Sequence, residues 1–285
     1  MYYDIASTIN GIMQTCGMPL WGVSPFDILE GSLIQCSGLK RLPVSSKSVI
    51  VAIFPYYCAC PPGEISQYAA ALDYHIVVGD MLKRAALMLR AKFERHSFEP
   101  FCDASPIPEV TAARLAGLGV LGRNGLLITP RYGSFVFIGE IVTDFELPKC
   151  GKPGDNCIAC GRCASLCPAG AITQNGASCE LCISHITQQK GELSDEQQKL
   201  IKKANTIWGC DICQNVCPMN QGIENTYIDE FKTNIVRTIS NESLDDENFE
   251  KDFASRAFMW RGKKVLKRNI GILHAAPDNN INDEC

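Results

Sequence analysis

Nine of the sixteen cysteines fall within residues 157–217, at spacings that iron–sulfur clusters use. The segment CIACGRCASLCP places Cys157, Cys160, Cys163 and Cys167 in the pattern C-x2-C-x2-C-x3-C-P. In bacterial ferredoxins the first three thiolates of such a run bind one 4Fe–4S cluster, and the fourth binds the other cluster. A second segment, WGCDICQNVCPMN, repeats the pattern C-x2-C-x3-C-P and ends it on Cys217. The spacing therefore predicts a first cluster on Cys157, Cys160, Cys163 and Cys217.

The second cluster takes Cys167, Cys210 and Cys213 by the same division and lacks one ligand. Two candidates, Cys179 and Cys182, lie between the motifs in SCELCISH. Paired C-x2-C motifs also build tetrahedral zinc sites, so zinc is an alternative. The third C-x2-C step and the proline that follows the last cysteine of each motif favour clusters. The spacing alone leaves both cysteines open as the missing ligand.

The remaining composition indicates a globular protein of the cytoplasm. The chain has 285 residues, an apolar share of 46% and a charged share of 20%, and its N-terminus does not resemble a secretory signal. No apolar run approaches the ~20 residues of a membrane helix, so we expect no membrane association. A formal charge of −4 argues against indiscriminate nucleic-acid binding. The cysteines outside the two motifs are expected to be small buried apolar residues in a reducing compartment: Cys16, Cys36, Cys58, Cys60, Cys102, Cys150, Cys179 and Cys285.

Three elements and a boundary are predicted from local patterns. Residues 48–57 and 133–145 are rich in Val, Ile and Phe and indicate strands, whereas residues 64–96 show a helical period and indicate one long helix. Ser194 before DEQQ is a helix N-terminus signal. Residues 147–156 are dense in Pro and Gly and mark a boundary. We therefore expect a mixed α/β (α+β) chain with domains at 1–147, 148–225 and 226–285.

Several segments besides the cysteines resemble the epoxyqueuosine reductase family, cobalamin-dependent iron–sulfur enzymes of tRNA queuosine synthesis. These segments are ISQYAAALDYH (65–75), CDASPIPEVTAARLAGLGVLGRNGLLITPRYGSFVFIGEIVTD (102–144), LCISHITQQKG (181–191), WGCDICQNVCPMN (208–220) and WRGKKVLKRN (260–269). They follow one another in the family's order.

The resemblance implies a fold, two kinds of cofactor and a site. The N-terminal domain would be a cobalamin-binding domain related to nitroreductases and reductive dehalogenases, followed by a ferredoxin-like domain with two 4Fe–4S clusters and a short helical tail. Cys182 would be the missing ligand of the second cluster, and cobalt would carry no protein histidine. Asp103 matches the family's catalytic aspartate, a proton donor, and His75 its active-site histidine. The implied cobalamin contacts are Asp103, Leu127, Ile138, Ser184, Asp211 and Ile212.

Simpler interpretations stand beside these roles. Asp103 alone could cap a helix that starts at SPIPEV, since Asp is favoured there. A lone helical histidine such as His75 is often an ordinary half-buried residue. The stretch DYHIVVG (73–79) nearly matches a known cobalamin motif, Asp-x-His-x-x-Gly, but its glycine falls one position late. The basic stretch near Trp260 is either a solvated helix start or a phosphate-binding patch: Arg261, Lys263, Lys264, Lys267 and Arg268.

The chain also departs from the family. Members usually continue into C-terminal helical repeats that help to grip tRNA, whereas this chain stops at Cys285. Ser66 stands near a position that is cysteine in some members. Ala71-Leu72 replaces a Gly-Arg pair, and Gly122-Arg123-Asn124 replaces a Gly-Lys pair. These changes concern the substrate side more than the clusters.

The leading hypothesis is an oxygen-sensitive reductase, expected to be a monomer. Electrons from a ferredoxin or flavodoxin would pass through the first and second clusters to cob(II)alamin, with tRNA as the substrate partner. One alternative is a corrinoid reductase that acts on a non-RNA substrate, as reductive dehalogenases do. Another is an electron-transfer or cofactor-carrier protein without catalysis.

Overall fold

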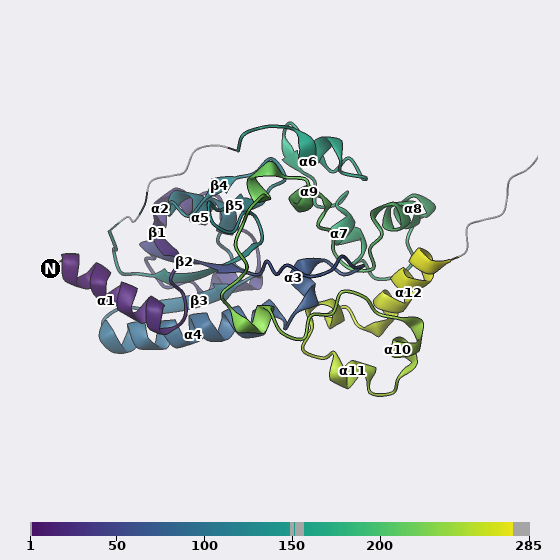
Figure 1. The fold of residues 1–285 in the computed structure, drawn as a ribbon. Helices are drawn as coiled ribbons and strands as arrows, with labels where there is room; N and C mark the ends of the chain where they lie inside the picture. The colour runs from purple at the N-terminus through teal and green to yellow at the C-terminus, as the bar shows by residue number, and fades with distance from the viewer. Residues whose placement is uncertain (1, 149–150, 152–156, 276–285) are drawn as a thin grey trace, which may run out of the picture.

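The computed structural model describes residues 2–148, 151 and 157–275. Cys150, Cys285 and most of the predicted boundary at 147–156 lie outside the described residues. The N-terminal part is built on one antiparallel sheet, and the cysteine motifs and the C-terminal helices lie together at the other end of the molecule (Figure 1). None of the helices in the described ranges has the length and hydropathy needed to cross a membrane.

The sheet has the strand order β1-β2-β6-β3. Both strand predictions are confirmed with shorter bounds, because 48–57 contains β2 and 133–145 contains β6. Every position of β2 is buried, since helices cover both faces of the sheet. The alternate side chains Ile50, Ala52 and Phe54 face α1 and α4, while Val49, Val51 and Ile53 face α5. The bounds are β1 (Trp21–Pro25), β2 (Ser48–Pro55), β3 (Phe98–Cys102), β6 (Val136–Thr143), α1 (Tyr2–Thr15), α4 (Tyr74–Lys92) and α5 (Glu109–Leu115).

The prediction of one long helix over 64–96 is wrong. A short helix, α3 (Gln67–Ala70), ends at the extended residue Ala71, and α4 begins at Tyr74. The Asp73 carboxylate accepts a hydrogen bond from the backbone N of His75 at 2.9 Å, and its own N–H donates to the carbonyl of Ser255 at 2.9 Å. Asp73 therefore starts a new helix. The break places His75 in the first turn of α4.

The cysteine module consists of short helices and a small hairpin. The predicted start of a helix at Ser194 is confirmed, because Ser194 and Gln197 form a capping box at the start of α8. Contacts between α6 and α9 bring the two cysteine motifs together. The elements are α6 (Arg162–Ser165), β7 (Ile172–Thr173), β8 (Gly176–Ala177), α7 (Ile183–Ile186), α8 (Asp195–Ala204), α9 (Ile212–Asn215) and the 3-10 turn η2 (Pro218–Asn220).

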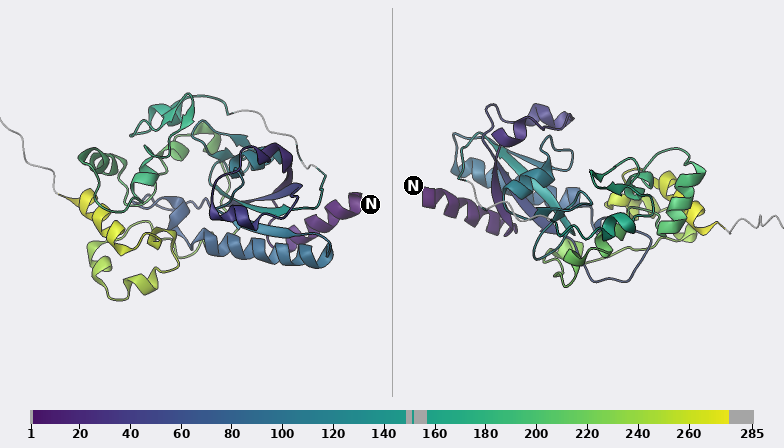
Figure 2. Two further views of the ribbon diagram at one scale, coloured as in Figure 1. Left: turned by 180° about the vertical axis from the view of Figure 1, so that it is seen from behind. Right: turned by 90° about the horizontal axis from the view of Figure 1, so that it is seen from above.

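The C-terminal segment packs on two parts of the chain (Figure 2). Ile228 and Phe231 join the core between the sheet and α4. Further on, Phe258 and Leu266 form a second core with Trp208 and with residues of α3. The domain limits at 147 and 225 remain predictions, and the packing crosses both. The elements are η3 (Asp229–Phe231), α10 (Asn241–Asp245), α11 (Phe249–Asp252), η4 (Ala257–Met259) and α12 (Lys263–His274).

Short elements complete the sheet region. A hairpin of the two-residue strands β4 and β5 follows α5, with Leu121 paired to Leu127. Residues 129–135 link β5 to β6, and Thr129 and Gly133 form an antiparallel bridge. The remaining bounds are α2 (Asp27–Glu30), η1 (Ser37–Arg41), β4 (Val120–Leu121) and β5 (Leu127–Ile128).

Candidate functional site

The first predicted thiol set is gathered in space. The pKa of the Cys163 thiol is raised by burial and, more weakly, by the neighbouring thiols of Cys157, Cys160 and Cys217. These four cysteines come from both motifs, and Cys217 lies directly before Pro218, the first residue of η2. The structure thus brings together the four residues that the spacing assigns to one cluster.

The second set is also gathered, and the structure separates its two candidate ligands. Burial, together with the thiols of Cys210, Cys182 and Cys167, raises the pKa of Cys213 to about 12. The Cys182 thiol interacts with Cys167 as well. By contrast, Cys179 is exposed, and its Sγ lies 3.8 Å from Nδ1 of His185. The geometry favours Cys182 over Cys179.

The donor set suits two iron–sulfur clusters. Burial disfavours the thiolate form at several of these positions, while bound iron stabilises thiolates. A tetrahedral zinc site needs Zn–S distances of about 2.3 Å, so its sulfurs must lie close together. Among the described residues, no three Cys, His, Asp or Glu side chains are grouped to hold a single ion.

A second group of polar side chains surrounds Asp103. The Nε2 atom of His75 lies 3.2 Å from Oδ2 of Asp103, and its Nδ1 atom lies 2.8 Å from Oδ1 of Asp73. The Tyr74 hydroxyl donates to the same Asp103 oxygen at 3.2 Å, and its ring stacks on Phe137 at 4.3 Å. His75 is therefore held at both ring nitrogens. A lone half-buried histidine, the simpler interpretation, does not describe it.

The interpretation of Asp103 as a helix cap is wrong, because α5 begins six residues later, at Glu109. Asp103 follows the last residue of β3 and has a backbone φ of 53°. Asp tolerates this left-handed conformation better than most residues do. The strained turn directs its carboxylate toward the start of α4 rather than along a helix axis.

The surroundings of His75 and Asp103 stabilise the charged form of both side chains. Hydrogen bonds to Asp103 and Asp73 raise the pKa of His75 to about 9, although burial opposes the rise. The bond to His75 lowers the pKa of Asp103 below its usual range. At neutral pH the pair is therefore an imidazolium and a carboxylate, which together hold one transferable proton.

Two cavities share Asp103, Tyr68 and Tyr74 on their walls. The larger, about 480 Å³, is also lined by His75 and by Ser184, which lies two residues after Cys182. The smaller, about 130 Å³, has an apolar wall that includes Leu127 and Ile138. Asp103 lies where the two cavities meet. Of the predicted contacts, the structure brings together Asp103, Leu127, Ile138 and Ser184.

Asp211 and Ile212 lie on a different cavity, of about 260 Å³, behind the second thiol set. The Asp211 carboxylate is buried and accepts hydrogen bonds from the Ser66 hydroxyl and from the backbone N of Gln67. Arg237 Nη1 lies 3.8 Å from it. The Asp211 side chain thus joins the motif to α3, and the structure does not place it beside Asp103.

The basic stretch after Trp260 divides into two parts. Arg268 donates to the carbonyls of Gln189 at 2.7 Å and Gly191 at 2.6 Å, so its inclusion in a phosphate-binding patch is wrong. Arg261 stacks on the ring of Trp260 at 3.5 Å. The exposed Trp260 indole donates to Gln188 at 3.1 Å and lines the larger cavity.

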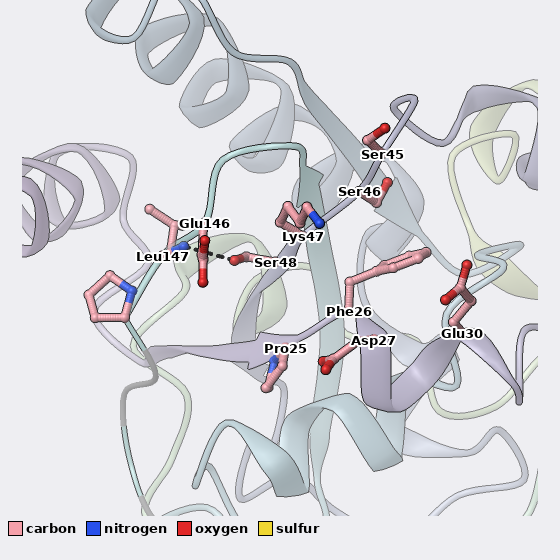
Figure 3. Close-up of a pocket in the computed structure, with 11 residues that line it drawn as sticks. Pro25, Phe26, Asp27, Glu30, Ser45, Ser46, Lys47, Ser48, Glu146 and Leu147 are labelled. Carbon is pink, nitrogen blue, oxygen red and sulfur yellow. Dashed lines mark hydrogen bonds between the residues drawn. The ribbon is translucent and has the colours of Figure 1, made fainter.

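The side chains that sequence reasoning missed are mainly aromatic. Tyr68, Tyr74 and Phe137 line the cavities, yet each also fits the pattern of an ordinary core residue. Trp260 opens the last segment that resembles the family and adjoins the basic stretch, but neither feature predicts that its ring lines the cavity. A separate cavity of about 680 Å³ lies beside the start of β2 and contains none of the predicted site residues (Figure 3). Its walls carry Asp27, Glu30, Lys47 and Glu146.

Two family models match the chain. Residues 156–220 match the family described as "4Fe-4S double cluster binding domain". Residues 39–104 match the family described as "Epoxyqueuosine reductase QueG, DUF1730". The first match covers both thiol sets, and the second ends at the segment that carries Asp103.

Curated relatives carry the name epoxyqueuosine reductase. The chain is 34% identical to that of Leadbetterella byssophila over 241 residues, which cover 82% of this chain and 79% of the relative. It is 31% identical to that of Listeria monocytogenes over 256 residues, or 88% of this chain and 64% of the relative. The chain thus spans a little under two thirds of the Listeria relative.

Solved structures confirm the predicted fold class. An epoxyqueuosine reductase solved with an epoxyqueuosine-modified tRNA-Tyr stem loop is 24% identical, with a TM-score of 0.82 over 96% of this chain and 81% of that chain. The catabolic reductive dehalogenase NpRdhA is 18% identical, with a TM-score of 0.51 over 93% of this chain and 35% of that chain. Both likenesses concern the fold.

Proposed function

The chain belongs to the epoxyqueuosine reductase family, as the resemblance predicted, and on that premise we propose that it reduces epoxyqueuosine to queuosine in tRNA. The observation that carries the proposal is the ion pair of His75 and Asp103 on the wall of the larger cavity, which Ser184, two residues after Cys182, also lines. A proton donor and an electron-transfer site thus lie beside one recess, as a reductase requires.

The cofactors that the family implies are compatible with these residues. Cys157, Cys160, Cys163 and Cys217 would hold one 4Fe–4S cluster, and Cys167, Cys182, Cys210 and Cys213 the other. Cobalamin would lie against the apolar wall that contains Leu127 and Ile138, with Ser184 nearby. The bound clusters supply single electrons, and cobalamin supplies a strongly reducing cobalt centre.

The chain's own residues would bind the substrate and deliver the proton. Asp73 fixes the His75 ring from one side, so that Nε2 faces Asp103. Asp103 would receive the His75 proton and pass it to the oxygen of the substrate, as a general acid does. Tyr74 holds the Asp103 carboxylate by a hydrogen bond.

We also propose that a nucleobase of the tRNA stacks on Trp260. Its indole lies at the larger cavity, is held by Gln188 and is supported on one face by Arg261. Bases stack on such aromatic rings without regard to sequence. Lys264 and Lys267 are exposed on α12 and would contact phosphates.

The electron donor and the cellular setting complete the proposal. A ferredoxin or flavodoxin would dock near the first thiol set, where Ile158 and Leu166 are exposed. We expect a monomer in the cytoplasm, where a reduced donor and tRNA are both present.

The test is a turnover assay under anaerobic conditions. The protein, loaded with both clusters and cobalamin, is chemically reduced and mixed with an anticodon stem loop that carries epoxyqueuosine. Mass spectrometry of the nucleosides should show queuosine, which lacks one oxygen atom. A fully loaded protein that leaves the stem loop unchanged would instead support a corrinoid reductase of a non-RNA substrate.

A further inference from the structure

A carboxyl group lies unpaired in the middle of the sheet. Glu140 belongs to β6, the strand between β2 and β3, and is paired in register with Val51 on one side and Phe101 on the other. Its side chain is fully buried, and neither carboxyl oxygen lies within normal hydrogen-bond geometry of a partner, although the Ser105 hydroxyl is close enough to influence its pKa. An ionised carboxylate without a partner is strongly unfavourable in such a place. Glu140 must therefore be neutral, with a proton on its carboxyl group.

A second carboxyl group connects Glu140 to the site. Glu109, in the first turn of α5, lines the smaller cavity together with Asp103. Burial and, to a smaller extent, the Asp103 carboxylate raise the pKa of Glu109 to about 7. Burial also raises the pKa of Glu140 well above its usual range, and Glu109 is the next cause. Glu140 lies on the same face of β6 as Ile138 and Val142, which pack against α5, so the helix that carries Glu109 covers the face on which Glu140 is buried.

The groups that act on this pair are acidic or neutral. Besides Asp103 and Glu109, the segment after β3 contributes the Ser105 hydroxyl, which opposes the rise at Glu140. The Cys102 thiol is a further titratable neighbour, and burial together with these carboxylates raises its pKa. In the described part of the chain, no Lys, Arg or His forms an ion pair with Glu140. Glu140 is therefore expected to hold a proton rather than to form an ion pair at neutral pH.

The reaction needs more protons than one ion pair holds. When an epoxide becomes an alkene, both C–O bonds break, the C=C bond forms and the oxygen leaves as water. This change takes two electrons, which the reduced iron–sulfur or flavin donor supplies, and two protons. The pair of His75 and Asp103 holds one proton. The second must reach Asp103 from elsewhere before the oxygen can leave as water.

We propose, resting on the function above, that Glu109 and Glu140 hold the second proton of each turnover and pass it to Asp103. Glu109 is the nearer member, because it shares a cavity wall with Asp103. Glu140 is the store, since the sheet shields it from water. Neither residue touches the substrate, so both act through Asp103.

The test compares Glu140→Gln and Glu109→Gln with a control, Glu94→Gln, at an exposed position on the segment after α4. Each reduced holoprotein is mixed with the stem loop, and the single-turnover rate is measured from pH 6 to pH 8.5. The wild-type rate should change little up to about pH 7. At pH 8 the single-turnover rate of both test variants should be at least tenfold below that of the wild type. Their rates should also fall steadily with rising pH, because these variants draw the second proton from solvent. The control should match the wild type.

A second measurement does not depend on turnover. Infrared difference spectra of the resting holoprotein, taken against each variant, should show the C=O band of a protonated carboxyl group that Glu140→Gln removes. Cluster absorbance and circular dichroism show whether each variant folds. If Glu140→Gln does not fold, the pH profile of Glu109→Gln tests the inference instead. Wild-type pH profiles in both test variants, or no protonated band at Glu140, would overturn the inference. If the wild type itself does not reduce the stem loop, the proposed function fails, and the infrared band still tests the pair.

Discussion

The Nε2 atom of His75 lies 3.2 Å from Oδ2 of Asp103, although the two residues belong to different elements. His75 sits in the first turn of α4, and Asp103 follows β3. Their contact joins the helix that covers one face of the sheet to the turn that leads to the other face. Because the ring is also bonded to Asp73, its orientation is set before any substrate arrives.

Replacing Asp103 should separate chemistry from cofactor binding. Asp103→Asn keeps the left-handed backbone conformation that Asn also tolerates, but it cannot deliver a proton. We expect turnover to fall by about 10²–10⁴-fold, with iron and cobalt content unchanged. Metal analysis and the stem-loop assay measure both quantities. Normal turnover in this variant would remove Asp103 from the mechanism.

The ion pair should make stability depend on pH in one direction. The pKa of His75 rises from 6.5 to about 9 on folding, so its contribution is fully present below pH 6.5 and is lost as the pH rises through about 9. The ring is about half exposed, so this contribution should be about 0.5–1 kcal/mol. Urea unfolding of the wild type and His75→Gln should differ at pH 6 and converge near pH 9.5. A difference that grows with pH would contradict the pairing.

The choice between Cys182 and Cys179 should be visible in iron content. Cys182→Ser removes a thiol from the second set, and we expect it to retain about four irons after anaerobic reconstitution, against about eight in the wild type. Cys179→Ser is the matched control and should retain all of them, because that thiol is exposed and lies beside His185. The opposite result would make Cys179 the ligand.

Trp260 should contribute to substrate binding rather than to chemistry. Stacking of a base on an aromatic ring is worth about 1–3 kcal/mol, so Trp260→Ala should raise KM for the stem loop about 5- to 150-fold. Trp260→Phe should have a smaller effect, since a phenyl ring also stacks. Trp21→Phe, on the edge strand β1, is the control. If kcat falls while KM is unchanged, the stacking role is incorrect.

The cysteine pattern could be predicted from the sequence because its chemistry is local. Spacers of two and three residues determine which thiols can reach one cluster, and the structure gathers the same two sets. The strands within 48–57 and 133–145 were predictable for a similar reason, since continuous apolar runs have few alternatives. The capping box at Ser194 also depends only on neighbours in the chain.

Other features depend on contacts between distant residues. The break before α4 requires the Ser255 carbonyl, which lies 182 positions from Asp73. Arg268 has the sequence context of a solvated cation, but carbonyls of the segment before α8 bind its guanidinium. Periodicity and charge describe a residue's own element, so they contain no information on these partners.

The sequence by itself determined the two cluster motifs, the mixed α/β class and, through resemblance, the family. Only the tertiary structure decided that Cys182 lies half-buried beside the second set while Cys179 is exposed, that His75 pairs with Asp103, and that Glu140 is buried in the sheet. Thiol spacing is a property of short stretches of chain. Pairing and burial instead depend on which strand and helix lie side by side, and that is settled only when the whole sheet and its helices pack.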